Sequence, residues 1–201
     1  MIVVTLVVGG SYVASSGLMQ PILDAEFQRG AAAMLRTNPQ LTPEMMETGR
    51  GIAAIGAKVG AFFSMPIAVV APGLLLWLLA KLVDASMSVR SALVVSAYAF
   101  VPRIIAAVLM SVQLQFMDPA KLDGFYRLSI GPARFMDPAT APPMLLAALG
   151  RLDVFIVWTT LLLAIGLAVQ AKVSLSKALV PAVIVWVCGT LPALWGAISA
   201  A

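Results

Sequence analysis

The sequence predicts an all-α, polytopic membrane protein with five transmembrane helices and short interfacial helices in its two long loops. Of the 201 residues, 61% are hydrophobic and only 11% are charged, and the mean hydropathy is +1.00. Soluble domains carry about 25% charged residues, so this composition is that of an integral membrane protein. We interpret the chain as one transmembrane domain, because five spans of about 20 residues leave room only for loops. The expected spans are residues 1–19, 51–83, 90–114, 152–171 and 178–200.

The first apolar stretch begins at Met1 without a basic leader, so we expect a retained span rather than a cleaved secretory signal. This start is consistent with an upstream cytosolic segment that the sequence does not include. Residues 22–36 then show an amphipathic pattern, which predicts a short helix lying on the membrane surface. Its apolar positions recur every three or four residues, at Leu23, Phe27, Ala31 and Met34.

The second span is expected inside a longer helix that begins near residue 43. Thr42, Pro43 and Glu44 combine a capping hydroxyl, a proline at the first helical position and an acid near the positive end of the helix dipole. This helix is predicted to continue through the span, with bends at Pro66 and Pro72.

Two sets of small residues are candidates for close helix packing. Gly56, Gly60 and Ser64 lie at four-residue spacing in the second span, and Ala164 and Ala168 do so in the fourth. Small residues let helix backbones approach, which favours association in lipid. We expect the glycine seam to pack inside the bundle, and contact with another protein is the alternative.

The third span, residues 90–114, contains the least usual chemistry. Pro102 has no N–H for the carbonyl of Tyr98, so the helix should kink. Arg103 follows near mid-span, where a charge is costly unless it faces helices, water or a counter-charge. Asp153 is the nearest carboxylate, although it lies closer to the outer end, and the Tyr98 carbonyl is an alternative acceptor. These four residues form a candidate intramembrane polar site.

The longest loop, residues 115–150, contains Phe-Met-Asp-Pro-Ala twice, at residues 116–120 and 135–139. Aspartate followed by proline is a favourable N-cap and first-turn pair, so each copy is predicted to start a short helix. Residues 144–149 predict one further short helix.

No catalytic, cofactor or metal site is expected, and we interpret the chain as non-enzymatic. Histidine is absent, which removes the commonest general base and neutral metal ligand. Asp118, Asp123 and Asp137 could serve a lipid-linked transferase, but Asp–Pro capping explains two of them. A net charge of +4 spread along the chain gives no nucleic-acid footprint. Cys188 is the single cysteine, so no internal disulfide can form.

Five short segments resemble the bacterial Yip (Ypt-interacting protein) domain family. They are residues 97–102, 152–158, 164–167, 43–45 and 176–178. The resemblance covers nearly the whole chain. It implies five spans, a cytosolic N-terminus and both long loops outside. Charge counts alone leave the orientation open. The long loops carry the larger number of Lys and Arg residues, which favours placing the long loops inside. The short turns carry their Lys and Arg residues close to the ends of the spans, which favours placing the short turns inside. The resemblance favours the short turns.

The sequence departs from the pattern of this family in three respects. It lacks a cytosolic segment before the first span, and it carries Arg103 directly after the proline. It also lacks the Asp-Leu-Tyr-Gly-Pro motif of eukaryotic relatives that work with Rab-type GTPases, so GTPase binding is not carried over. Some bacterial relatives resemble accessory subunits of ABC-type exporters.

We therefore expect a non-catalytic subunit that scaffolds or regulates a larger membrane complex, with an ABC-type exporter as the favoured complex. The alternative is a small-anion transporter or channel component that uses Arg103. The expected partners are the lipid bilayer and other integral membrane subunits or a second copy, with no nucleic acid. The expected location is the bacterial cytoplasmic (inner) membrane.

Overall fold

The computed structural model describes residues 2–38, 40 and 42–199. Within these ranges the fold is all-α and contains no strand, which confirms the predicted class. The α-helices are α1 (Ile2–Ala14), α2 (Gln20–Thr37), α3 (Pro43–Ala80), α4 (Val89–Ala99), α5 (Val101–Phe116), α6 (Pro143–Gly150), α7 (Val154–Ala171) and α8 (Leu175–Ser199). The 3₁₀ helices are η1 (Lys81–Val83), η2 (Pro119–Lys121), η3 (Phe125–Leu128) and η4 (Pro132–Phe135).

Four segments of the described chain are long and apolar enough to cross a membrane. They are Phe62–Val83, Val89–Phe116, Val154–Ala171 and Leu175–Ile198. These segments correspond to the second to fifth expected spans. The last of the expected spans was placed at residues 178–200, and its residue 200 lies outside the described residues.

The N-terminal helix is shorter than the expected span over residues 1–19. α1 has 13 residues, which rise about 20 Å against an apolar bilayer core of about 30 Å. The chain then turns, and the Ser16 hydroxyl donates to the Val13 carbonyl at 2.7 Å. The next helix, α2, begins at Gln20, with Pro21 in its first turn. Residue 1 lies outside the described residues.

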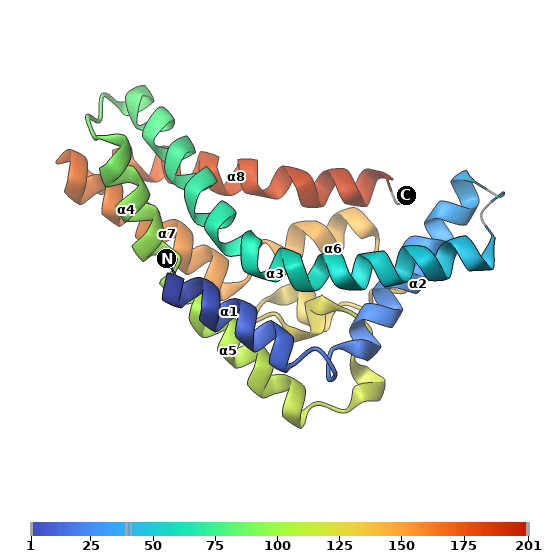
Figure 1. Ribbon diagram of the computed structural model, residues 1–201. Helices are drawn as coiled ribbons and strands as arrows, with labels where there is room; N and C mark the ends of the chain where they lie inside the picture. Colours follow the sequence, from blue (N-terminus) through green and yellow to red (C-terminus); the bar gives the residue numbers. More distant parts are fainter. Residues whose placement is uncertain (1, 39, 41, 200–201) are drawn as a thin grey trace.

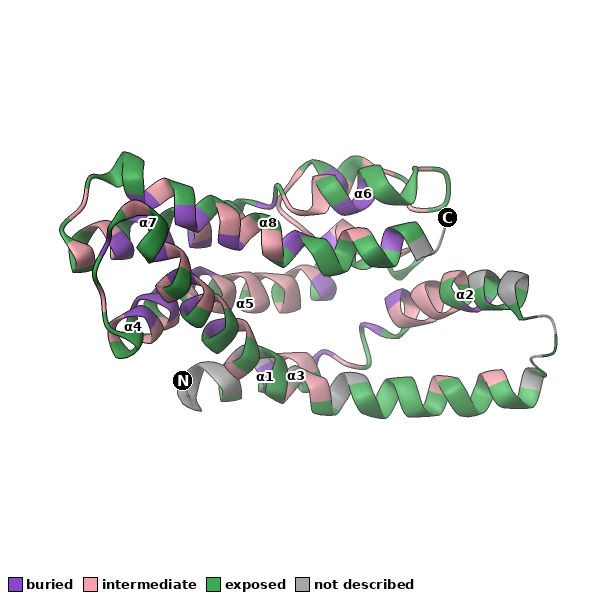
Figure 2. Cartoon of the chain, turned by 90° about the horizontal axis from the view of Figure 1, so that it is seen from above, coloured by how far each residue is buried: buried purple, intermediate pink, exposed green. Residues whose placement is uncertain are grey.

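α3 is one continuous helix of 38 residues, and it starts as predicted, with the Thr42 side chain accepting from the N–H of Met45. Within the expected span over residues 51–83, the segment identified as long and apolar enough to cross a membrane is Phe62–Val83. Figure 1 shows the helix bending where it enters the bundle, and Pro66 and Pro72 lie inside it. We call residues 44–60 the α3 arm. Figure 2 shows it largely exposed.

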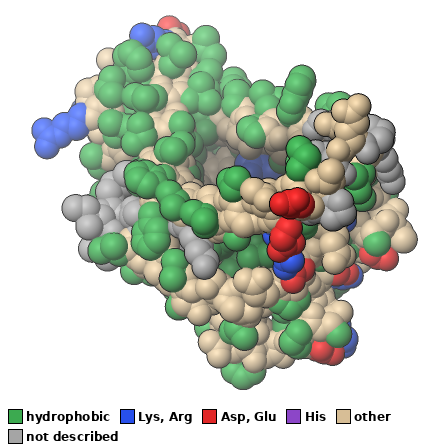
Figure 3. All heavy atoms as spheres, turned by 45° about the vertical axis from the view of Figure 1, so that its right-hand side comes forward, with side chains coloured by type: hydrophobic (Ala, Val, Ile, Leu, Met, Phe, Trp, Pro, Cys, Tyr) green, Lys and Arg blue, Asp and Glu red, His purple; other side chains and the backbone are tan. Residues whose placement is uncertain are grey.

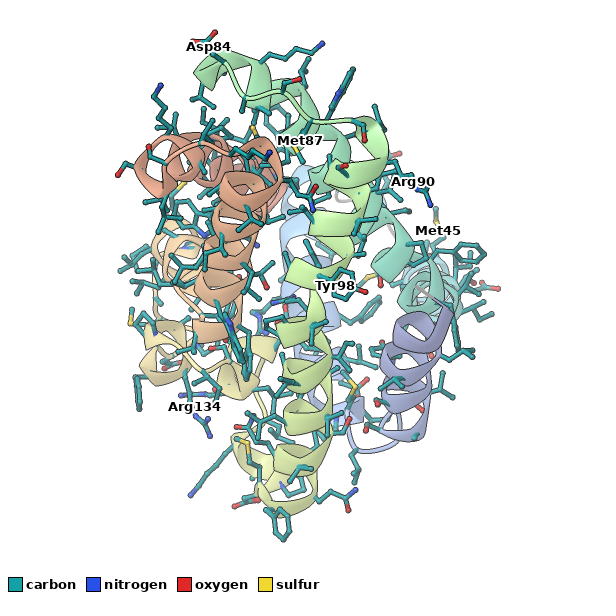
Figure 4. The ribbon with its side chains drawn as sticks, turned by 90° about the vertical axis from the view of Figure 1, so that its left-hand side faces the viewer. Met45, Asp84, Met87, Arg90, Tyr98 and Arg134 are labelled. Atoms are coloured by element: carbon teal, nitrogen blue, oxygen red, sulfur yellow. The ribbon has the colours of Figure 1, made fainter. Side chains whose placement is uncertain are left out.

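The bundle is tight at one end and open at the other. α3, α4, α7 and α8 converge beside the two short turns and splay apart away from them (Figure 1). Figure 4 shows Asp84 and Met87 at the tight end and Arg134 towards the opposite end. The core of the tight end is built from small and branched side chains. Its fully buried members include Leu76, Ala164, Leu167, Ala178 and Ala182.

The third span is interrupted where proline predicts a distortion. α4 ends at Ala99, α5 begins at Val101, and the Phe100 N–H donates to the Ser96 carbonyl at 3.1 Å. Pro102 is fully buried just beyond this break. The break lets the second half of the span diverge from the tight core.

The long loop folds against the open end of the bundle. A small core joins it to α5 and to the start of α2, through Met19, Ile22, Leu114, Leu122 and Leu128. The predicted helix over residues 144–149 is confirmed as α6.

The two copies of the repeated pentapeptide fold differently. The first starts η2, and the Asp118 side chain caps it by accepting from the Ala120 N–H at 3.0 Å. The second copy forms a turn in which the Asp137 carboxylate accepts from the Ala139 N–H at 2.9 Å. The predicted second helix is therefore wrong.

Candidate functional site

Arg103 lies between two cavities in the splayed half of the bundle. The first, of about 430 Å³, is enclosed by α1, α5, the long loop and the start of α7. The second, of about 440 Å³, lies between α3, α7 and α8. Arg103 lines both cavities. Figure 3 looks into a hollow framed by apolar side chains, with basic side-chain atoms at its floor.

Asp153 faces the first cavity and is buried. One carboxylate oxygen accepts from the Phe155 N–H at 2.9 Å and so caps α7, and the other accepts from the Ile130 N–H at 2.7 Å. The carboxylate attracts the charge of Arg103 across the cavity. Within the described part of the chain, no direct ion pair joins these two side chains.

The depths of Arg103 and Asp153 in the bundle explain how they meet. Arg103 lies fourteen residues beyond Val89, a rise of about 21 Å from the tight end. The eighteen residues of α7 rise about 27 Å from the same end to Asp153. The difference of about 6 Å is within reach of a long arginine side chain. Arg103 is the fifteenth of the 28 residues of Val89–Phe116 and so stays near the middle of its own span, as predicted.

Arg151 is the functional candidate that the sequence analysis missed, because its charge was assigned to the loop. Its Nε donates to Thr190 Oγ1 at 3.2 Å, and its carbonyl accepts from Trp186 Nε1 at 3.2 Å. Both contacts tie it to α8, and its side chain lines the second cavity with Arg103. Burial lowers the pKa of Arg151, and the nearby positive charge of Arg103 lowers it further. No local sequence pattern marks this contact, because Thr190 lies 39 residues away.

Tyr98 does not belong to this site. Its side chain is 74% exposed and lines a groove on the outer face between α4 and α7. Figure 4 shows its position on α4. Five residues separate Tyr98 from Arg103, which is about 140° around a helix, and the break at Phe100 separates them further. The predicted grouping of four residues is therefore corrected: Arg103 and Asp153 line one cavity without a direct ion pair among the described residues, Pro102 is packed in the break, and the Tyr98 side chain faces outward.

The two small-residue seams differ in their surroundings. Ala164 is fully buried, and Ala168 packs against the core of the tight end. A Cβ added at Gly56 or Gly60 would have no heavy atom within 4 Å. The expectation that the glycine seam packs inside the bundle is therefore wrong for both glycines, because the α3 arm extends beyond the other helices. Ser64 lines the first cavity.

In a comparison with protein-family models, the Yip1 domain matches residues 1–196. The chain belongs to the Yip1 domain family. No curated protein and no solved structure matches it. Family membership and four apolar candidate spans make this Yip1 domain an integral membrane protein.

The loop acids of this Yip1 domain are engaged in structural contacts. Asp118 and Asp137 cap local turns, as described above, and Asp123 accepts two bonds from Arg127, at 2.8 and 2.9 Å. The guanidinium of Arg127 holds the pKa of Asp123 below its usual range. In the part of the chain that the structure describes, no cluster of three or more acidic or cysteine side chains is arranged to hold a metal ion.

Proposed function

We propose that this Yip1 domain protein is a non-catalytic membrane subunit that binds a helix of another integral membrane protein through the α3 arm. One observation carries the proposal: an exposed apolar stripe continues along one face of α3, through the arm and into the first turn of the span. Its members are Ile52, Ile55, Val59 and Phe63, which are 67%, 67%, 52% and 64% exposed. This spacing places all four on one side of the helix.

The shape of this face suits a helix better than it suits lipid chains alone. Gly56 and Gly60 lie along one edge of the stripe, and a Cβ added at either would meet no heavy atom within 4 Å. Close backbone approach at such glycines gains van der Waals contact, which is the main attraction between helices in a membrane.

The side of the α3 arm opposite the apolar stripe contacts α2. Arg50 makes an ion pair with Asp24 of α2, and its guanidinium lies over the Phe27 ring at 6.0 Å from the centroid. This contact is polar and lies where α2 approaches the arm. It leaves the glycine face available to a partner.

We further propose that the complex is an ABC-type exporter in the bacterial inner membrane and that α1 contributes to a fifth span. The resemblance of bacterial family members to exporter subunits supports the first part. The apolar composition of α1 supports the second, since residues 2–14 contain no charged side chain.

The test is purification of the chain from its own membrane in mild detergent, followed by identification of the co-purifying proteins. Gly56→Leu and Gly60→Leu should each release the partner without changing the melting temperature of the isolated protein. Gly10→Leu is the control, because it also fills open space but lies on α1. Retention of the partner by both arm variants would refute the proposal.

A second candidate function is small-anion transport, and the position of Arg103 between two cavities favours it. Reconstitution of the purified chain in liposomes separates the two candidates. Anion flux that Arg103→Gln abolishes would support transport and would show that the protein has a turnover of its own. Absence of anion flux would favour the first candidate, a non-catalytic membrane subunit.

A further inference from the structure

We propose that Arg103 and Arg151 form a binding site for a phosphate-bearing anion within the splayed half of the bundle. Both guanidinium-bearing side chains line the cavity between α3, α7 and α8, and Arg103 also reaches the cavity beside α5. Among the described residues that line the two cavities, Asp153 is the single acid. The site therefore carries a net positive charge of one.

The carboxylate of Asp153 does not neutralise this charge by contact. Its two oxygens already accept the N–H groups of Phe155 and Ile130, and it forms no direct ion pair with Arg103 within the described chain. Its role is to cap α7 and to fasten the loop. An incoming anion would therefore meet guanidinium groups whose charge is only partly balanced.

The donors in this region also point to an anion. Arg151 uses its Nε on Thr190, and its two terminal nitrogens have no acceptor among the described residues. Thr159 and Thr160 line the same cavity, but their hydroxyls donate to carbonyls of their own helix at 2.8 and 3.0 Å. The guanidiniums are therefore the donors that remain for a ligand.

Two neighbouring guanidiniums suit phosphate in particular. Each presents a planar fork of N–H groups that matches phosphate oxygens in pairs, and such charge-assisted bonds are roughly twice as strong as neutral ones. Burial and mutual repulsion disfavour two positive charges in one cavity, as the lowered pKa of Arg151 shows. A phosphate would relieve both, because its negative charge offsets the repulsion and its oxygens replace lost water.

Most of the remaining cavity wall is apolar. Ile67, Pro72, Phe100, Leu163 and Val185 surround the two arginines. An anionic phospholipid could place its phosphate at the arginines and its acyl chains along such side chains, and free phosphate could occupy the same donors. The shared chemistry is the phosphate group, and the experiment has one arm for each source.

The first arm measures lipid binding to the purified full chain by native mass spectrometry, with phosphatidylglycerol and with phosphatidylcholine. We expect phosphatidylglycerol to bind at least tenfold more tightly. Arg103→Gln and Arg151→Gln should each abolish this preference. Arg90→Gln should retain it, because Arg90 is exposed at the tight end and lines neither cavity.

The second arm measures inorganic phosphate by isothermal titration. Saturable binding that both glutamine variants weaken at least tenfold would assign the site to free phosphate. Equal binding of the two lipids together with no saturable phosphate binding would overturn the proposal, as would full affinity in both variants. If the glutamine variants do not fold, Arg103→Lys and Arg151→Lys replace them, because lysine keeps the positive charge but lacks the planar guanidinium that pairs with two phosphate oxygens. Unchanged affinity in both lysine variants would then overturn it.

Discussion

The hydroxyl of Ser96 on α4 donates a hydrogen bond of 2.7 Å to the main-chain carbonyl of Val69 on α3. Ser96 is fully buried, and a Cβ added at Gly73 would lie 3.1 Å from the Ser96 Cβ. The two helices therefore touch through a glycine and a serine beside Pro72, which cannot donate to the helix ladder. Pro72 removes the helical donor of the Ala68 carbonyl, and the Ser96 hydroxyl adds an interhelical bond at the next carbonyl of α3.

Replacing Ser96 by alanine should lower the free energy of unfolding by about 1 kcal/mol, because one buried interhelical hydrogen bond is lost. Thermal or denaturant unfolding in a fixed detergent measures the change. Ser111→Ala is the matched control, since that hydroxyl donates to the Ala107 carbonyl of its own helix. Equal stability of Ser96→Ala and the parent would contradict the prediction.

The contact between α4 and α7 should be intolerant of added volume at Gly166. A Cβ at this position would overlap the side chain of Val95, whose branched carbons stand close to the α4 backbone and cannot rotate away. Gly166→Ala should therefore destabilise the protein by about 1–3 kcal/mol. The control is Gly56→Ala, which fills open space and should be neutral or stabilising by up to about 1 kcal/mol. The same unfolding assay compares both variants. Similar losses in the two would show that the packing argument is mistaken.

The ion pair between Asp123 and Arg127 predicts a pH dependence of stability. The pKa of Asp123 is lowered in the folded state by the hydrogen bonds from Arg127. The ion pair therefore contributes its full stabilisation above the pKa of Asp123 in the unfolded chain, about 3.9. This stabilisation is lost as the pH falls through the lower pKa of Asp123 in the folded protein. The side chains are 39% and 27% exposed, so solvent screening keeps the contribution below about 1 kcal/mol.

Asp123→Asn measures this contribution. The variant should melt slightly below the parent at pH 7, and the difference should vanish at a pH below 3. Glu47→Gln is the control, because that carboxylate is 75% exposed and lies 3.8 Å from Arg50. A difference that persists undiminished at low pH would exclude the ion pair as its cause.

Local chemistry made much of the fold predictable. Hydropathy identified the four candidate spans, Thr42 with its proline located the start of α3, and Pro102 located the break in the third span. The end of α1 at Ala14 was missed because the expected span was continued across Ser15, Ser16 and Gly17 to the apolar Leu18 and Met19. Hydropathy does not register a turn fixed by the hydroxyl of Ser16.

The candidate site was only half predictable. Arg103 stood out because a charge inside a span demands a partner, and Asp153 was the nearest acid. Arg151 was missed because its contact with Thr190 spans 39 residues, and no local pattern encodes it. Tyr98 was included because Pro102 cannot donate to its main-chain carbonyl, but the Tyr98 side chain faces outward, away from the cavities that Arg103 lines.

The orientation of the bundle yields a last prediction, in which the two short turns face the cytosol and residues 115–150 face outside. Basic side chains stand beside the span ends at Lys81, Arg90, Lys172 and Lys177, and such density favours the cytosolic side. Single cysteines in a Cys188→Ala background test it, at Ser86, Ser174 and Thr140. All three positions are exposed, so each thiol would be accessible from its own side. In intact cells an impermeant thiol reagent should label Thr140→Cys only, and permeabilised cells should label all three. Labelling of Ser86→Cys but not Thr140→Cys in intact cells would establish the opposite orientation.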